Sequence, residues 1–109
     1  MMANAARDPL WQAQVALEVA LQPQRRAEIE TLCMRCHAPM AVTQAELSGA
    51  PSPTMAQLEA GEVMGELARD GVACALCHQI QDRDLGQLAS MGGGFRIGKE
   101  RKIFGPYKD

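Results

Sequence analysis

The sequence predicts a small, mainly α-helical domain that ends in a short C-terminal β-hairpin or an extended flap. Apolar side chains recur with helical spacing along residues 10–21, and proline and glycine stand where helices would begin and end. Glycines are also frequent after residue 90, where helical periodicity is lost. A chain of 109 residues is the size of one domain, so we expect residues 1–109 to form a single unit.

The first expected helix follows Asp8 and ends near Pro23. Asp8 can cap a helix, and Pro9 fits the first turn, where a missing N–H costs nothing. An apolar stripe is expected to face the core, and its members are Leu10, Ala13, Leu17, Ala20 and Leu21, widened by Trp11, Val15 and Val19. A second helix is expected from Gln24 into Cys33, so the cysteine motif that begins there lies at a helix C-terminal end.

Two more helices are expected in the middle of the chain. The stretch "MAVTQAELSG", residues 40–49, predicts a short helix that Gly49 stops. Thr54 can cap a third long helix, which Asp70 and Gly71 would end, although Gly61 lowers its helical propensity.

The C-terminal stretch "MGGGFRIGKERKIFGPY" predicts no helix. Its two β-prone pieces, residues 95–97 and 102–104, are separated by glycine and charged residues. This pattern predicts a small hairpin or an extended flap.

Composition excludes several classes of function. A net charge of −2 provides no basic field for nucleic acid. No apolar run reaches the roughly 20 residues that a membrane span needs. The N-terminus lacks the basic start and apolar stretch of a signal peptide. Aromatic residues make up only 4% of the chain, so large flat side chains are nearly absent from the expected core.

All four cysteines and both histidines fall in two copies of one pattern, "LCMRCHAPM" at residues 32–40 and "VACALCHQI" at residues 72–80. Cys-x-x-Cys places two thiols about one helical turn apart, which suits one metal, one disulfide or the two vinyl groups of one porphyrin. The histidine directly after the second cysteine discriminates, because a haem held by two thioethers needs an iron ligand there. The motifs therefore predict two covalently attached haems, at residues 33–37 and 74–78.

Three other interpretations use the same cysteines. The four thiolates could form a structural zinc site, but both histidines would then be unexplained and the pairs are unusually far apart. Two disulfides leave the histidines unexplained as well. A thioredoxin-like redox pair requires a βαβ setting, which the helical pattern does not offer.

The segments "LCMRCHAPMA", "DGVACALCHQI" and "IFGPY" resemble multihaem c-type cytochromes, in particular the group related to the tetrahaem cytochrome of nitrifying bacteria. The resemblance covers roughly residues 25–109. It implies two haem c groups that form much of the core of a dihaem domain. The implied thioether donors and proximal iron ligands are Cys33, Cys36, His37, Cys74, Cys77 and His78.

The same resemblance implies a setting for the chain. Haem c is attached outside the cytoplasmic membrane, so we expect a periplasmic or otherwise extracytoplasmic protein whose signal peptide is absent from this sequence. Chains of this kind continue past the "GPY" element with further haem motifs, so a fragment that ends at Asp109 is expected. Its partners would be redox proteins or the remainder of a larger multihaem chain.

The distal iron ligands have to come from other residues, because both histidines are used. Methionine is the next soft ligand, and the best-placed candidates are Met55, Met64 and Met91. Met34 and Met40 are too close to their own motif and are expected to pack against porphyrin. Lys99, Lys102 and Tyr107 are outside possibilities.

The motifs favour electron transfer through the two haems. The alternative is a haem enzyme or sensor that binds a small nitrogen compound or gas at an open distal site. Its candidate proton donors, which form no recognisable catalytic set, are Arg35, Asp82, Arg83 and Arg96. A structural zinc-binding domain is the remote alternative.

Overall fold

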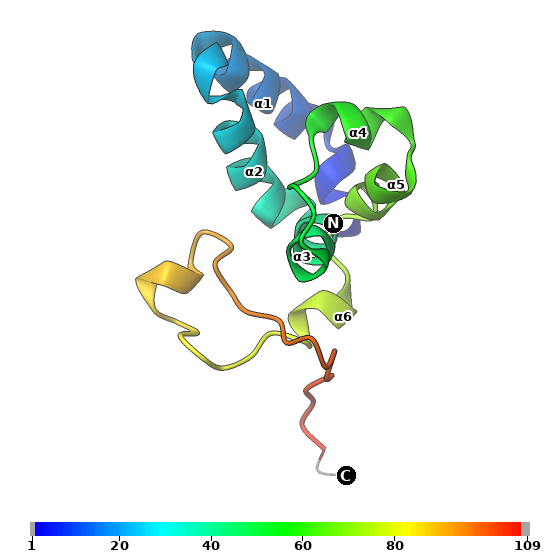
Figure 1. Ribbon diagram of the computed structural model, residues 1–109, viewed down its shortest axis with the longest axis vertical. Helices are drawn as coiled ribbons and strands as arrows, with labels where there is room; N and C mark the ends of the chain where they lie inside the picture. The colour runs from blue at the N-terminus through cyan, green and yellow to red at the C-terminus, as the bar shows by residue number, and fades with distance from the viewer. Residues whose placement is uncertain (1, 108–109) are drawn as a thin grey trace.

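A computed structural model describes residues 2–107 as a group of packed helices followed by an irregular C-terminal segment (Figure 1). The α-helices in chain order are α1 (Pro9–Leu21), α2 (Arg26–His37), α3 (Pro39–Ser48), α4 (Met55–Ala60), α5 (Val63–Arg69) and α6 (Cys74–Cys77). Short 3₁₀ helices are η1 (Met2–Arg7), η2 (Pro23–Arg25) and η3 (Leu88–Ser90). The mainly α fold class is thus confirmed. Within residues 2–107, no helix is long and apolar enough to cross a bilayer.

Helices α1 and α2 lie side by side and are joined by a tight turn (Figure 1). The Asp8 carboxylate caps α1 by accepting a hydrogen bond from the Leu10 N–H at 2.9 Å, and Pro9 occupies the first turn. Pro23 begins the turn that separates the two helices. The expected start and end of α1 are therefore confirmed.

The expected core-facing stripe of α1 is wrong in its main members and correct in the three residues that widen it. Trp11, Val15 and Val19 are buried, whereas Leu10, Leu17 and Leu21 are 78%, 51% and 68% exposed. Helix α1 is apolar around most of its circumference, so helical periodicity alone does not select one face. The packing of α2 and η1 selects the ridge of residues spaced by four, which begins at Trp11.

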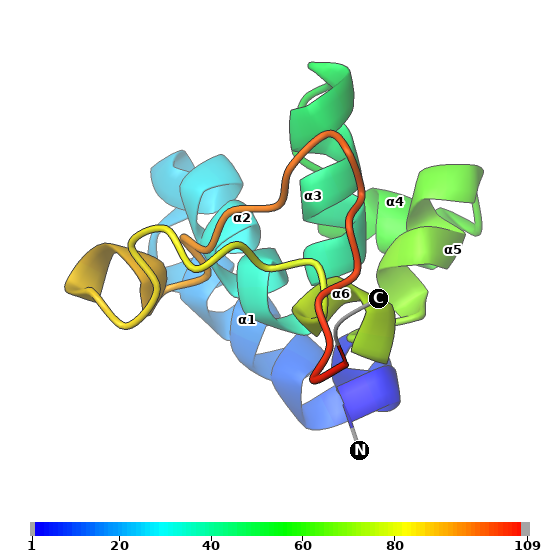
Figure 2. The same ribbon diagram turned by 90° about the horizontal axis from the view of Figure 1, so that it is seen from below.

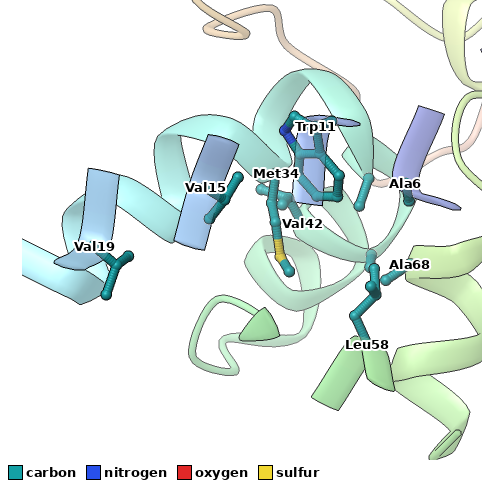
Figure 3. Packing of buried hydrophobic residues seen from close by; sticks show 10 residues of the cluster. Ala6, Trp11, Val15, Val19, Met34, Val42, Leu58 and Ala68 are labelled. Atoms are coloured by element: carbon teal, nitrogen blue, oxygen red, sulfur yellow. The ribbon is translucent and has the colours of Figure 1, made fainter. Parts of the chain in front are cut away.

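The core is built from protein side chains that converge from η1 and helices α1 to α5. Its buried members are Ala6, Trp11, Val15, Val19, Met34, Ala38, Ala41, Val42, Leu58 and Ala68. Met34 is fully buried and lies among Trp11, Val15 and Val42 (Figure 3). The expectation that Met34 packs against porphyrin is therefore wrong, because its side chain is enclosed by the helices.

The third long helix is broken into α4 and α5. Gly61 adopts a left-handed conformation with φ of 70° and ends α4, so the chain folds back on itself. Gly65 lets α5 approach α4 closely, because a Cβ atom there would overlap the Gln57 carbonyl. The expected cap at Thr54 and the end before Gly71 are both confirmed.

The expected hairpin between residues 95–97 and 102–104 is not formed, and residues 2–107 contain no β-strand. Ile97 instead makes an isolated antiparallel bridge with Ile80, directly after the second motif. From Gln79 to Tyr107 the chain is irregular apart from η3 and crosses one side of the helical group (Figure 2). The alternative of an extended segment is the better description.

Candidate functional site

The first cysteine motif lies in the last turn of α2, as expected from the sequence. The spacing of three residues places Cys33 and Cys36 on one side of the helix. Cys33 is half-buried and packs against the core, whereas Cys36 is exposed. One thiol is thus fixed by packing and the other is open to solvent.

The imidazole of His37 is fixed from two directions. Its Nδ1 lies 3.1 Å from the carbonyl oxygen of Ala5 in η1. Its ring also stacks on Trp11, with centroids 4.5 Å apart and planes within 7°. A carbonyl oxygen can only accept, so Nδ1 carries the proton and the lone pair of the neutral ring lies on Nε2.

The second cysteine motif forms its own one-turn helix, α6, rather than the end of a long helix. Gly71 has a φ of 67° and separates α5 from the motif, and its missing side chain leaves room for the backbone of Met2 and Ala3. Leu76 is buried and anchors the turn, whereas Cys74 and Cys77 are exposed. Both thiols of this motif are therefore open to solvent.

His78 is held by the C-terminal segment. Its Nδ1 lies 2.8 Å from the carbonyl oxygen of Phe104, and the Phe104 N–H donates to the His78 carbonyl at 2.6 Å. By the same reasoning as for His37, the Nδ1 atom donates and Nε2 keeps its lone pair. The His78 ring is exposed, and no aromatic ring in residues 2–107 stacks on it.

Both motifs therefore combine two free thiols with an imidazole whose Nδ1–H donates to a backbone carbonyl. A hydrogen bond from Nδ1–H is typical of histidines that bind a metal through Nε2, because it fixes the tautomer and the ring plane and makes Nε2 more basic. The partner carbonyls come from opposite ends of the chain, from Ala5 and Phe104. Sequence reasoning missed both residues, because a carbonyl oxygen leaves no trace in residue type.

Trp11 was missed as a site residue as well. The sequence placed it on the edge of an apolar stripe, although it is the only tryptophan of a chain with few aromatics. Its ring is 8% exposed, and its Nε1–H has no hydrogen-bond partner in the described part of the chain. The stack on His37 makes it part of the first site.

The environment of Cys33 acts on its ionisation. Burial raises the pKa of the Cys33 thiol, and the nearby Cys36 and Glu18 raise it further. Cys33 is therefore held as a neutral thiol at neutral pH, which disfavours both thiolate coordination of a metal and rapid disulfide exchange.

The four cysteines do not converge on one site. Within residues 2–107, no group of three or more His, Cys, Asp or Glu side chains could hold a metal ion, and all four cysteines are free. The chain as described thus forms neither the four-cysteine zinc site nor the two disulfides that the sequence left open. It also lacks, over the same residues, the strands of a thioredoxin-like setting.

The candidate distal ligands occupy different environments. Met55 and Met64 are half-buried and pack against the hydrophobic core, whereas Met91 is 63% exposed. The outside candidates Lys99, Lys102 and Tyr107 are all exposed.

The glycine loop that follows Met91 lies against the first motif. A Cβ at Gly93 would come within 2.6 Å of the Cβ of Arg35, which stands between Cys33 and Cys36. Met91 is therefore the candidate whose side chain is free and whose loop already contacts a motif.

The candidate proton donors are spread over the surface. Arg96 lies 3.4 Å and Arg83 3.9 Å from the carboxylate of Asp84, and Asp82 is exposed nearby in sequence. Arg35 instead lies in the first motif. These contacts are exposed ion pairs of the C-terminal segment, which is the ordinary setting for solvated charges.

Apolar side chains remain uncovered beside both motifs. Leu32 is 57% exposed and lies one turn before Cys36 on the same face of α2. Ile103, Phe104 and Tyr107 are exposed on the segment that holds His78. Each motif thus has uncovered apolar side chains on the element that carries or holds it.

Comparison with known proteins yields no relationship: no family model, no curated protein and no solved structure shows a significant match to the chain. The interpretation of the site therefore depends on its own geometry and on the motifs.

Proposed function

We propose that the chain is a dihaem electron-transfer domain, with one haem c bound at residues 33–37 and another at residues 74–78. The observation that carries this proposal is the common geometry of His37 and His78. Each imidazole follows two free thiols and has its Nδ1–H donated to a backbone carbonyl, which leaves Nε2 as the ligand atom.

The donor set fits haem c better than a metal ion alone. Each cysteine would add across a vinyl C=C of the porphyrin: the Sγ–H bond and the C=C π bond break, a C–S bond forms at one carbon, and the proton forms a C–H bond with the π electrons at the other carbon. No atom is lost and no oxidant is needed. Two pairs of free thiols serve two porphyrins. When bound, the group supplies one-electron cycling between Fe(III) and Fe(II).

The haems also complete the apolar interior in this proposal. The helices enclose a core of mostly small and aliphatic side chains, and Leu32, Ile103 and Phe104 are left uncovered beside the motifs. A porphyrin at each motif covers part of this surface, and covalent attachment holds it in a domain too small to enclose it by packing alone.

The cellular setting follows from the cofactor. Haem c attachment occurs outside the cytoplasmic membrane, so the proposed location is the periplasm or another extracytoplasmic space. The proposed partners are redox proteins or further haem domains of a longer chain, in line with the resemblance of the motifs to multihaem c-type cytochromes.

Intact mass spectrometry under denaturing conditions tests the attachment. The chain, expressed with its export and haem-attachment machinery, is expected to carry two haem masses. The double variants Cys33→Ala/Cys36→Ala and Cys74→Ala/Cys77→Ala should each carry one, and each is the matched control of the other. A wild-type chain that leaves the same machinery without haem, or with zinc, contradicts the proposal.

The alternative of a haem enzyme or sensor is favoured by the packing of two distal candidates. Because Met55 and Met64 pack against the hydrophobic core, each would have to leave that packing to close a sixth iron position. Carbon monoxide binding to the reduced protein tests this alternative, with Met91→Leu as the matched variant. Rapid binding that Met91→Leu does not change indicates an open site. Binding that appears only in Met91→Leu identifies Met91 as the ligand and favours a carrier.

A further inference from the structure

We infer that the two haem sites differ in reduction potential. The site of His37 has the higher potential, and the site of His78, which faces solvent, has the lower potential. This inference rests on the proposed haem attachment at both motifs. It adds which of the two sites has the higher reduction potential, and it assigns a role to Trp11. Neither follows from the motifs or their spacing.

The first observation is the difference in shielding between the two imidazoles. His37 is half-buried, and one face of its ring is covered by Trp11, which is itself only 8% exposed. His78 is exposed and has no such cover within residues 2–107. The oxidised haem iron carries one more positive charge than the reduced iron, so exclusion of water disfavours the oxidised form. Shielding therefore raises the potential at the site of His37.

The second observation concerns the hydrogen bonds to Nδ1. The bond from His78 Nδ1 to the Phe104 carbonyl is 2.8 Å long, and a separate bond from the Phe104 N–H to the His78 backbone carbonyl joins the same two residues. The bond from His37 to Ala5 is 3.1 Å long. A stronger donation from Nδ1–H makes Nε2 more basic, and a more basic ligand stabilises Fe(III). The hydrogen bonds thus lower the potential at the site of His78 and act in the same direction as shielding.

Trp11 is the positioning residue of the first site. Its ring is held among Val15 and Met34 in the core, so it is a rigid surface rather than a mobile cover (Figure 3). The near-parallel stack at 4.5 Å fixes the plane of the His37 ring and keeps water from one of its faces. It acts on the iron only through His37.

The inequality gives electron flow a direction. With haem bound at both motifs, a one-electron donor at the exposed site would lose one electron and reduce the iron held at residues 74–78 from Fe(III) to Fe(II). Passing that electron to the iron held at residues 33–37 would return the first iron to Fe(III) and reduce the second to Fe(II). No proton or further reactant is required, and the second step is favourable when the site of His37 has the higher potential.

Spectroelectrochemical titration of the two single-haem double variants tests the order of the potentials. Both titrations are run in saturating imidazole, so that the sixth ligand is the same at both irons and only the protein surroundings differ. The variant Cys74→Ala/Cys77→Ala keeps the site of His37. At one applied potential its Fe(II)/Fe(III) ratio should be about tenfold higher than that of Cys33→Ala/Cys36→Ala, which corresponds to a midpoint potential about 59 mV higher. Equal or reversed potentials overturn the inference.

Substitution of Trp11 tests the cause. Trp11→Leu should lower the potential in Cys74→Ala/Cys77→Ala, and should leave the potential of Cys33→Ala/Cys36→Ala unchanged. Trp11→Phe keeps an aromatic ring against His37 and should retain most of the wild-type value, which separates stacking from loss of the fold. No shift with Trp11→Leu, or equal shifts at both sites, overturns the role of Trp11. Haem counting by mass separates this result from failure of the proposed function, which would leave no haem to titrate.

Discussion

Truncation of Met34 is expected to destabilise the domain strongly, although the residue stands inside a cofactor motif between two cysteines. Its side chain is completely buried in the protein core rather than turned toward the thiols. The sequence alone predicts a contact with porphyrin for the same side chain. Met34→Ala therefore distinguishes the two roles.

The expected cost has two parts. Burying a methionine side chain is worth about 1.5–3 kcal/mol, most of which is lost in alanine. The substitution also removes about 75 Å³ of side chain, and a cavity that fails to collapse adds about 1.8 kcal/mol at roughly 24 cal/mol per Å³. Because Met34 is enclosed by several helices, we expect partial collapse and a total of about 2–4 kcal/mol.

Urea unfolding followed by far-ultraviolet circular dichroism measures this change as a shift of the midpoint. Met34→Leu conserves volume and is expected to cost less than about 1.5 kcal/mol. Leu17→Ala is the control on the surface, since Leu17 is 51% exposed and its truncation should cost below about 1 kcal/mol. A Met34→Ala cost no greater than that of Leu17→Ala would refute the assignment of Met34 to the core and of Leu17 to the surface.

Three further outcomes follow from single contacts. Gly65→Ala should lower stability by about 1–3 kcal/mol in the same unfolding assay despite better helix propensity, because its Cβ would overlap the Gln57 carbonyl; an unchanged midpoint would contradict the close approach. In the haem-free chain, timed alkylation with peptide mass mapping should find that Cys33 reacts slowest of the four thiols at neutral pH, because its raised pKa leaves little thiolate. Its alkylation rate should rise with pH. Alkylation of all four cysteines at one rate would contradict the raised pKa of Cys33. Glu30→Ala should lower the free energy of unfolding by about 1–3 kcal/mol, because the buried carboxylate accepts a hydrogen bond from the Met55 N–H. Glu30→Gln keeps an acceptor oxygen and should lower it less in the same urea assay. Equal losses for the two variants would argue against that hydrogen bond.

The two histidines show how one motif can be set in two different surroundings. The first motif continues a long helix and receives its carbonyl from the N-terminal η1. The second motif forms an isolated turn and receives its carbonyl from the C-terminal segment at Phe104. The two imidazoles thus have different hydrogen-bond partners, which lets single-site variants compare the two surroundings.

Local signals in the sequence were sufficient for the ends of several elements. Asp8 with Pro9 begins α1, Gly49 ends α3, and Thr54 caps α4, because capping and left-handed glycine conformations depend on a few neighbouring residues. The same is true of the cysteine motifs, whose spacing alone places two thiols and an imidazole within one or two turns. These features need no knowledge of the rest of the chain.

Only the tertiary structure decided which surfaces meet. Leu17 and Val15 are equally apolar, and it is the packing of α2 that buries one and exposes the other. The long helix expected after Thr54 divides at Gly61 because α5 can bury its apolar face by folding back onto α4. The contacts that orient His37 and His78 span 32 and 26 residues, and backbone carbonyls supply them. Since every residue has a carbonyl, residue identity determined which atoms could bind a cofactor, and the path of the chain determined how those atoms are held.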